Sequence, residues 1–225
     1  MIIDWKAHIL PGLDRKCDSH VKAIQLMIYA KRAGVDKLVA MPFYEAGTDL
    51  RQFIEMRDEA FASVRGLVGE DMPELVLGTE FKYDKQILDT DGVELLKETP
   101  VLLVDFGGKL PSDEELKALH DYFGDRLMAS DADSLSDEDK LRLTKLGFQS
   151  VVDLSEIHHS KDIKKLLPFV ESGFVRGFGE TVFAVSPMNG RENCVHPVAK
   201  SFRDFLRLLL ALHDAAAIEQ AWQWN

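Results

Sequence analysis

The sequence predicts an α/β protein with a parallel sheet, and more closely a seven-stranded α/β barrel. Short apolar segments alternate with longer amphipathic segments along most of the chain, a pattern typical of buried parallel strands joined by helices. The 225 residues, 46% of them hydrophobic, are enough for one domain of this kind. We therefore expect residues 1–225 to form a single domain.

The expected strands are short apolar runs that lie between helical segments. They are residues 2–4, 37–41, 74–78, 101–105, 126–129, 150–153 and 174–177. Strands of this kind that are connected through helices run parallel to one another.

The expected helices carry recognisable start and stop signals. They are residues 19–33, 50–67, 85–89, 112–122, 136–146, 161–171 and 199–224. Ser112 and Glu115 are spaced as a capping box, in which each side chain binds the backbone N–H of the other residue. Gly34 and Gly147 follow the helices before them directly and indicate helix ends.

Acidic residues follow several of the predicted strands. They are Glu80, Asp105, Asp131, Asp133, Asp153 and Glu180. In a parallel barrel the carboxyl ends of all strands meet at one face, so these carboxylates are expected to converge there. The alternative for each residue is a cap on the next helix, and Asp131 and Asp133 could equally begin a helix at Ser134 or Ser136.

The first strand leads into Asp4-Trp5-Lys6-Ala7-His8 and then a Pro-Gly turn. Alternation along a strand predicts that Asp4, Lys6 and His8 share one face. This stretch resembles the D-x-H-x-H signature of the PHP (polymerase and histidinol phosphatase) metal-dependent phosphoesterases. It is most similar to the bacterial capsule-associated tyrosine-protein phosphatases of the CpsB/CapC type, which begin D-I-H-S-H-I-L-P-G-I-D-D-G.

Further segments resemble that branch in order and spacing. Residues 39–44 are similar to V-A-T-P-H-Y, residues 77–81 to G-A-E-I, and residues 103–106 to L-I-E-F. The resemblance implies a distorted PHP-type barrel. It also implies a site for two or three divalent ions, commonly manganese, and hydrolysis of phosphotyrosine on a bacterial tyrosine kinase.

The same resemblance implies an altered metal site. His8 and Glu80 match ligand positions, and Asp105 and Glu180 keep carboxylates where carboxylates are expected. Histidines of the family are replaced at four positions: Lys6, Phe43, Ser130 and Val182. A lysine ammonium has no lone pair to give to a metal.

Two states of this site follow as hypotheses. In one, a single manganese or zinc ion is held by His8, Glu80 and Asp105 with Asp131 or Glu180. In the other no metal binds. Lys6 then replaces the ion by donating to Glu80, Asp105 or Glu180, and Phe43 fills the space of a lost histidine and excludes water.

Three further features remain open at this stage. Lys6 could face solvent at the barrel mouth. Residues His158 and His159 are alternative ligands, although adjacent residues of an extended segment point apart. The candidates to rebuild the site are Asp131, Asp133, His158 and His159.

Three functions fit the sequence. The favoured one is a divergent or inactive phosphatase that acts as a binding or regulatory module. The second is an active phosphotyrosine phosphatase with a reduced or rebuilt metal site. The third is a different barrel enzyme that uses one metal or a Schiff base on Lys6; neighbouring carboxylates would keep that lysine protonated and oppose nucleophilic attack.

Composition restricts the partners. A formal net charge of −11 argues against nucleic acid and anionic membranes, and no apolar stretch is long enough for membrane insertion. The two cysteines, Cys17 and Cys194, fit neither a metal motif nor a disulfide framework. We expect a cytoplasmic protein, and the resemblance implies a bacterial tyrosine kinase or another polysaccharide-assembly protein as partner.

Overall fold

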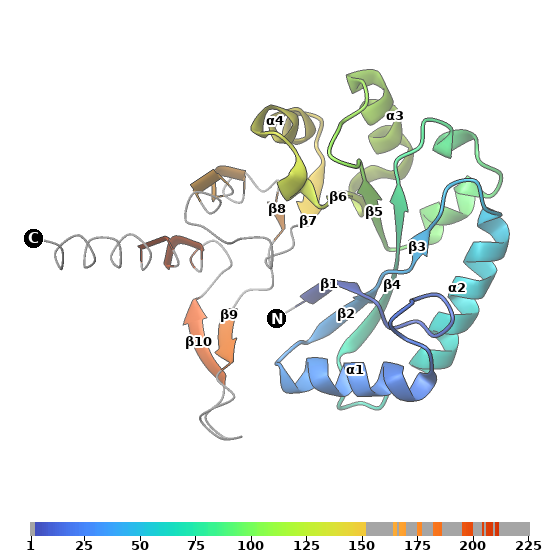
Figure 1. Cartoon of the computed structure of the whole chain (residues 1–225), viewed down its shortest axis with the longest axis vertical. Helices are drawn as coiled ribbons and strands as arrows, with labels where there is room; N and C mark the ends of the chain where they lie inside the picture. The colour runs from blue at the N-terminus through green and yellow to red at the C-terminus, as the bar shows by residue number, and fades with distance from the viewer. Residues whose placement is uncertain are drawn as a thin grey trace, which may run out of the picture.

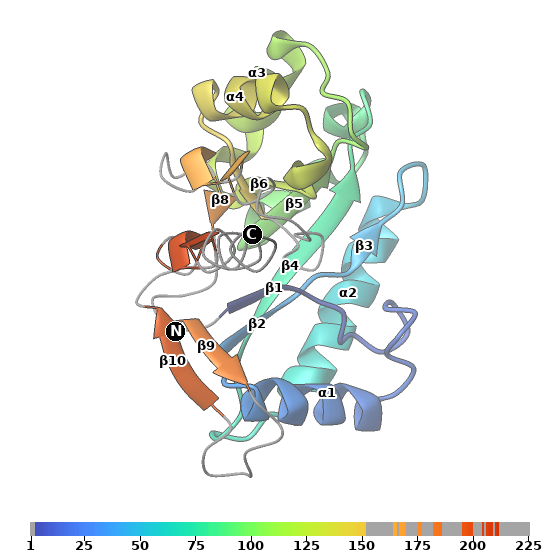
Figure 2. The same cartoon turned by 60° about the vertical axis from the view of Figure 1, so that its left-hand side comes forward.

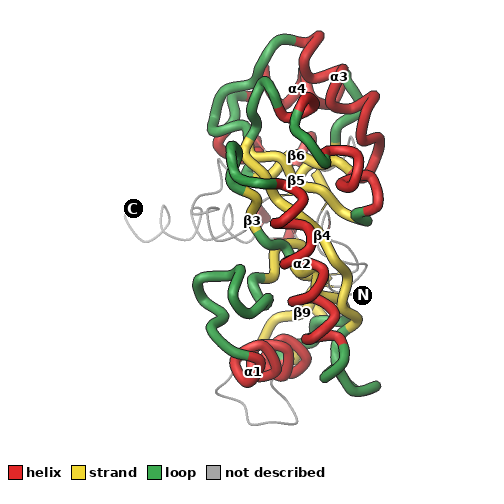
Figure 3. The backbone as a smooth tube through the Cα atoms, turned by 90° about the vertical axis from the view of Figure 1, so that its right-hand side faces the viewer, coloured by secondary structure: helices red, strands yellow, loops and turns green. Residues whose placement is uncertain are grey.

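A computed structural model describes residues 3–151 of this chain without a gap. Beyond them it describes residues 164–165, 167–169, 175–176, 182–185, 195–199, 204, 206–208 and 210–211. The architecture is a curled sheet of parallel strands with helices packed on its outer side (Figures 1 and 3). The predicted α/β class with a parallel sheet is confirmed.

The main sheet has eight strands. They are β1 (Ile3–Ala7), β2 (Lys37–Ala40), β3 (Phe43–Tyr44), β4 (Glu74–Lys82), β5 (Val101–Asp105), β6 (Leu127–Ser130), β7 (Gln149–Val151) and β8 (Val175–Arg176). Their order is β1-β2-β4-β5-β6-β7-β8, and β3 pairs with β4. Within the described residues β1 and β8 do not pair, so the sheet is a curled half-barrel and the closed seven-stranded barrel is not confirmed (Figure 2).

Within residues 3–151, the four α-helices begin on side-chain caps, which explains their starts. They are α1 (His20–Arg32), α2 (Leu50–Arg65), α3 (Asp113–Phe123) and α4 (Asp137–Lys145), capped by Ser19, Asp49, Ser112 and Ser136. Each cap oxygen accepts a hydrogen bond from the third backbone N–H after it. The capping box of Ser112 and Glu115 is present in both directions.

Several short elements were not predicted. The segment expected as a helix at residues 85–89 contains only the 3₁₀ helix η1 (Ile87–Asp89), and further 3₁₀ helices are η2 (Val93–Glu98), η3 (Gly124–Arg126) and η4 (Ala132–Ser134). The strands β9 (Val182–Val185) and β10 (Val195–Ala199) form a separate antiparallel pair. The helix predicted from residue 199 was therefore placed too early, because Ala199 ends a strand.

The outer face of the sheet is sealed by the helices. Leu38 and Ala40 of β2 pack with Met27 of α1 and with Phe61 and Val64 of α2. A second cluster joins β4, β5 and β6 to helices further along the chain; it includes Phe81, Leu102, Val104, Ala129, Leu116, Leu119 and Leu143. Burial of these side chains on one side leaves the other face of each strand directed into the curl of the sheet.

The inner face has its own apolar floor. Val39, Met41, Leu103 and Met128 are all at most 2% exposed and form one cluster. Gly78 leaves room for this packing, because a Cβ there would lie 2.6 Å from the Met41 Cε atom. This inner apolar cluster adjoins the carboxyl ends of the strands, where the polar side chains lie.

Candidate functional site

The candidate site lies at the carboxyl ends of β1, β4 and β6. Strand register places Glu80 beside Phe43 on one side and Leu103 on the other. Two residues further along β5, Asp105 lies beside Ser130. Because Leu103 belongs to the inner cluster, Glu80 also points into the curl of the sheet.

An irregularity in β1 determines which way the side chains of residues 4–8 point. Asp4 pairs with Leu38 and Ala7 pairs with Ala40, so β1 takes three steps where β2 takes two. This bulge breaks the alternation of side chains. Asp4 is therefore in register with the outer-face residue Leu38, and the prediction that it shares a face with Lys6 is wrong.

The Lys6 ammonium lies at the centre of the site. Its Nζ atom is 2.8 Å from Glu80 Oε1 and 3.1 Å from Asp131 Oδ2, and it donates to Ser130 Oγ at 3.2 Å. The ammonium thus has three oxygen partners from the ends of two strands. The alternative was that Lys6 faces solvent at the barrel mouth. Its side chain remains partly exposed, but its ammonium is directed at these three oxygen atoms.

Burial sets the electrostatics of this group. The Lys6 side chain is 32% exposed, whereas Glu80 is 5% exposed. Burial by itself would lower the pKa of Lys6, but the hydrogen bond and charge of Glu80, together with Asp131, raise this pKa above its usual value. Lys6 is therefore protonated at neutral pH.

Ser130 and Asp131 hold the far side of the cluster. Ser130 donates a short hydrogen bond of 2.6 Å to Glu80 Oε1 and is 4% exposed. Asp131 has φ 49°, and among the described residues no other non-glycine residue has a positive φ. This left-handed backbone costs free energy, and it sets the position from which the Asp131 carboxylate reaches Lys6.

His8 pairs with Asp14 instead of joining the Lys6 cluster. Its Nδ1 atom lies 3.2 Å from Asp14 Oδ1, while the other oxygen of Asp14 accepts the Leu10 N–H at 2.7 Å. The hydrogen bond to Asp14 raises the pKa of His8 despite partial burial. The imidazole is 41% exposed and Asp14 is 3% exposed, so this pair lies at the rim.

Two expected site residues have other surroundings. Asp105 does not pair with Lys6; its Oδ1 atom accepts the Gly107 N–H at 2.7 Å and so closes a local turn. Phe43 is 46% exposed, because β3 is a two-residue strand that pairs with β4. Of the three carboxylates expected as alternative partners of Lys6, Glu80 is in contact with it, and Asp105 is not. The prediction that Phe43 excludes water is wrong for this structure, because its side chain is exposed.

The remaining predicted residues contribute less to the described geometry. Glu180, His158 and His159 lie outside the described residues. Val182 begins β9, whose partner β10 belongs to the separate two-stranded sheet. Asp133 lies in η4, two residues after Asp131.

The described side chains do not fit a divalent ion. Within the described residues there is no group of three or more His, Cys, Asp or Glu side chains that could hold one. Glu80 and Asp131 do converge, but they converge on an ammonium, and His8 and Asp105 are each engaged elsewhere. We therefore derive no metal-dependent step from these residues.

The cluster also argues against covalent chemistry on Lys6 or Ser130. A serine beside a lysine is activated only when the amine is neutral and can accept a proton. Glu80 and Asp131 raise the pKa of Lys6, so the amine is neither a base nor a Schiff-base nucleophile near neutral pH. The geometry suits charge compensation and hydrogen bonding.

Two residues that help to position the site, Asp14 and Arg57, were not predicted from the sequence to do so. The contact of Asp14 with His8 depends on the turn at residues 10–14, which brings the two residues together. Arg57 of α2 is 3% exposed and donates to Thr79 and Thr99, each at 2.8 Å, so it fixes β4 from the outer side next to Glu80. No sequence signal marks a lone arginine in a helix for this role.

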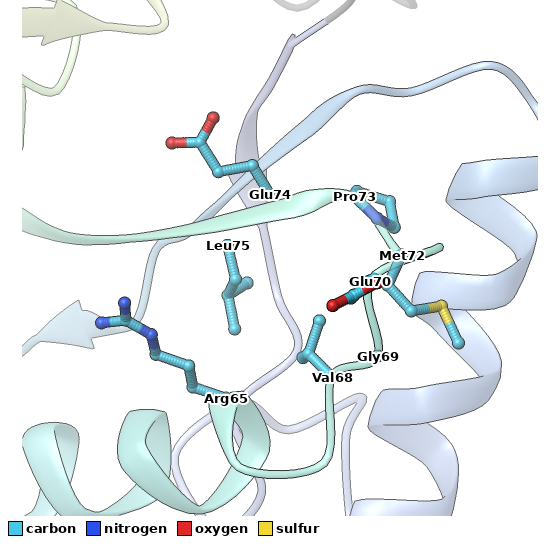
Figure 4. A pocket seen from close by; sticks show the side chains of 8 residues that line it. All are labelled: Arg65, Val68, Gly69, Glu70, Met72, Pro73, Glu74 and Leu75. Carbon is cyan, nitrogen blue, oxygen red and sulfur yellow. The ribbon is translucent and has the colours of Figure 1, made fainter.

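The described part of the chain also contains pockets away from Lys6, and two of them are well defined. A pocket of about 390 Å³ lies where α2 ends and β4 begins, lined by Arg65, Val68, Gly69, Glu70, Met72, Pro73, Glu74 and Leu75 (Figure 4). A second, of about 260 Å³, includes Tyr44, Thr48 and Asp84. Neither Lys6 nor Glu80 lines either of these two pockets.

A curled parallel sheet with polar side chains at the carboxyl ends of its strands defines an α/β barrel-like protein with its site at that edge. The family described as capsular polysaccharide synthesis, CpsB/CapC, matches residues 2–121, more than half of the sequence, and the chain belongs to this family. The expected resemblance to the capsule-associated branch is confirmed.

The fold agrees with a solved relative. It superposes with a TM-score of 0.57 and 17% identity on a chain from the crystal structures of YwqE from Bacillus subtilis and CpsB from Streptococcus pneumoniae. Those proteins are described as unique metal-dependent tyrosine phosphatases, and the match covers 77% of this chain and 76% of that one. A search of curated proteins finds no match. None of the helices in the described part of the chain could cross a membrane by length and hydropathy.

Proposed function

We propose that this CpsB/CapC-family chain is a binding or regulatory member that does not hydrolyse phosphate esters, and that Lys6 provides the positive charge of its site. The observation that carries the proposal is the 2.8 Å contact between Lys6 Nζ and the buried carboxylate of Glu80. We also propose that residues 1–225 form one domain.

The charge balance supports this proposal. A carboxylate as buried as Glu80 is stable only with a cation or strong hydrogen-bond donors nearby. Lys6 provides the cation and Ser130 provides a donor at 2.6 Å. The buried carboxylate of Glu80 therefore has both a cation and a hydrogen-bond donor from this chain.

The ammonium also opposes metal binding. Manganese or zinc would have to approach a carboxylate oxygen to roughly 2.0–2.2 Å. Glu80 Oε1 already has the Lys6 ammonium at 2.8 Å, so a dication at the same oxygen would lie against a positive charge. Loss of the Lys6 proton would remove this repulsion. It is unfavourable because the pKa of Lys6 is raised.

We further propose that the chain retains recognition of a partner although it does not act on it. YwqE and CpsB are described as metal-dependent tyrosine phosphatases, and the family description refers to capsular polysaccharide synthesis. The proposed partner is a bacterial tyrosine kinase or another polysaccharide-assembly protein of the cytoplasm. Binding without hydrolysis would protect or sequester the bound segment.

The test combines metal analysis with an activity assay. Purified protein is analysed for manganese, iron and zinc, and phosphotyrosine hydrolysis is measured with and without added Mn²⁺. We expect less than stoichiometric metal and no metal-dependent hydrolysis. Tightly bound metal together with hydrolysis that a chelator abolishes would overturn the proposal.

The second candidate is an active phosphatase with a reduced or rebuilt site. The observation in its favour is that Glu80 and Asp131 already converge within 3.1 Å of one point, the Lys6 Nζ atom. If Lys6 were displaced, these two carboxylates with His8, Asp105 or Glu180 would be the ligands of one manganese or zinc ion. The same metal analysis separates the two candidates, because only this one requires a bound ion in the wild-type protein.

A further inference from the structure

The outward face of α1 has an unusual composition for a helix that packs on a sheet. Ala23 and Met27 are fully buried against the outer face of the sheet. On the opposite side, Val21 is 69% exposed and Tyr29 is 61% exposed. Within the described residues these are the two most exposed large hydrophobic side chains.

The exposed apolar residues form a stripe. Val21, Ile24, Ile28 and Tyr29 are spaced at i, i+3, i+7 and i+8, and Ile24 and Ile28 are partly exposed. This spacing places the four side chains along one side of a helix. A single exposed apolar residue needs no explanation, whereas a stripe of four has the pattern by which helices bind other helices.

The charges beside this stripe have one sign. Helix α1 contains Lys22, Lys31 and Arg32 and no Asp or Glu, although the whole chain has a net charge of −11. All three basic side chains are exposed, and none forms an ion pair within the described part of the chain. The exposed face of α1 thus combines apolar and basic side chains on a chain whose net charge is negative.

We propose that this face, defined by Val21, Ile24, Ile28, Tyr29 and the flanking basic residues, is a docking surface for an acidic amphipathic helix of a partner protein. The apolar side of such a helix would cover the stripe, and its Asp or Glu side chains would meet Lys22, Lys31 and Arg32. Tyrosine is among the residues that contribute most to binding when it is covered at an interface.

Charge also separates this occupant from two others. A second copy docked antiparallel, α1 on α1, would bring Lys22 close to Lys31 and Arg32 of the other copy, which is repulsive. A flat anionic membrane would also approach the surface around α1. Because the chain has a net charge of −11, that approach is repulsive. A single acidic helix contacts α1 alone and avoids both penalties.

The proposal is independent of Lys6. Helix α1 packs on the outer face of β1 and β2 (Figures 1 and 2). The Lys6 ammonium instead contacts Glu80, Ser130 and Asp131 at the ends of β4 and β6. Variants of α1 are therefore expected to leave metal content and phosphatase assays unchanged. Variants of Lys6 are expected to leave docking on α1 unchanged.

The experiment uses the full chain and a labelled synthetic peptide. The peptide is an amphipathic helix with leucines along one side and glutamates flanking them, and its matched control carries lysines in place of the glutamates. Binding is measured by fluorescence anisotropy at two salt concentrations. We expect the glutamate peptide to bind, with affinity that falls as salt rises, and the lysine peptide not to bind.

Surface variants identify the face. We expect V21S/Y29S and K22E/K31E/R32E each to weaken binding at least about tenfold. The control M56S/L67S changes two other exposed apolar residues, 46% and 54% exposed, and is expected to bind as the wild type does. Circular dichroism checks that all variants are folded.

Three results would overturn the proposal. One is absence of binding, or equal loss of binding in the control variant. Another is self-association of the wild type in sedimentation that V21S/Y29S abolishes, which would assign the face to a second copy. The third is binding to anionic vesicles, but not to the peptide, that the same variant abolishes.

Discussion

Replacing Lys6 with methionine removes the ammonium but keeps most of the side-chain volume. The Glu80 side chain, which is 5% exposed, then retains the 2.6 Å hydrogen bond from Ser130 and loses its cation. Breaking a buried ion pair by removal of one partner costs about 3–5 kcal/mol. Because the Lys6 side chain is 32% exposed, water compensates part of this loss, and we expect about 2–3 kcal/mol.

Urea unfolding followed by circular dichroism measures this cost as a shift in midpoint at constant slope. The matched control is Lys37→Met, which removes a lysine at 3.0 Å from Glu74, a carboxylate that is 61% exposed. This surface pair is expected to contribute at most about 1 kcal/mol.

A second variant tests the physical reason. In K6M/E80Q the buried charge is gone, and the amide oxygen of glutamine can still accept the Ser130 hydrogen bond. We expect the double variant to recover at least about 1 kcal/mol relative to Lys6→Met alone. The reasoning would be refuted if Lys6→Met cost no more than Lys37→Met, or if Glu80→Gln gave no recovery.

Three further predictions concern neighbouring groups. The pKa of His8 is raised by Asp14, so the stability from this pair is fully present below the unfolded-state pKa of about 6.5 and is lost as pH rises through the higher folded-state pKa. Urea unfolding of wild type and His8→Asn should therefore differ more at pH 5.5 than at pH 8, and a difference independent of pH would contradict this. Ser130→Ala should cost about 1–3 kcal/mol in the same assay, because it removes a donor from buried Glu80; an unchanged midpoint would show that Lys6 alone suffices. Asp131→Ala should be less stable than Asp131→Asn by about 1 kcal/mol, because asparagine tolerates the left-handed backbone at φ 49°, and equal stabilities would show that the conformation relaxes.

The sequence predicted the parallel strands well because their signal is local. Residues 37–41, 74–78 and 101–105 are apolar runs between helices, and β2, β4 and β5 begin at the predicted residues. The capping box at Ser112 was predictable for the same reason, since its two members lie three residues apart. The two-residue strand β3 has no such pattern, because it depends on pairing with β4.

The site was less predictable because it depends on register. The bulge in β1 is set by how β1 pairs with β2, and it separates Asp4 from Lys6. The sequence indicates three carboxylates as candidate partners of Lys6. Only the strand register shows that Glu80 is level with Leu103, whereas Asp105 lies two residues further along β5. The contact to Asp131 requires a left-handed backbone at this residue. Non-glycine residues rarely adopt that conformation, and the sequence does not indicate which aspartate will do so.

One ammonium carries less positive charge than two metal ions. The described contacts indicate which other groups stabilise the carboxylates near the site. Lys6 compensates Glu80 and Asp131, while Asp105 receives a backbone N–H from Gly107 and Asp14 receives one from Leu10. Hydrogen bonds from neutral donors thus stabilise carboxylates that a metal centre would otherwise draw together. We expect a cluster held in this way to be stable without an ion. Its described cation is Lys6, whose ammonium is already paired with Glu80 and Asp131. For this reason we expect the site to contribute to the fold and to partner recognition, and not to the hydrolysis of a phosphate ester.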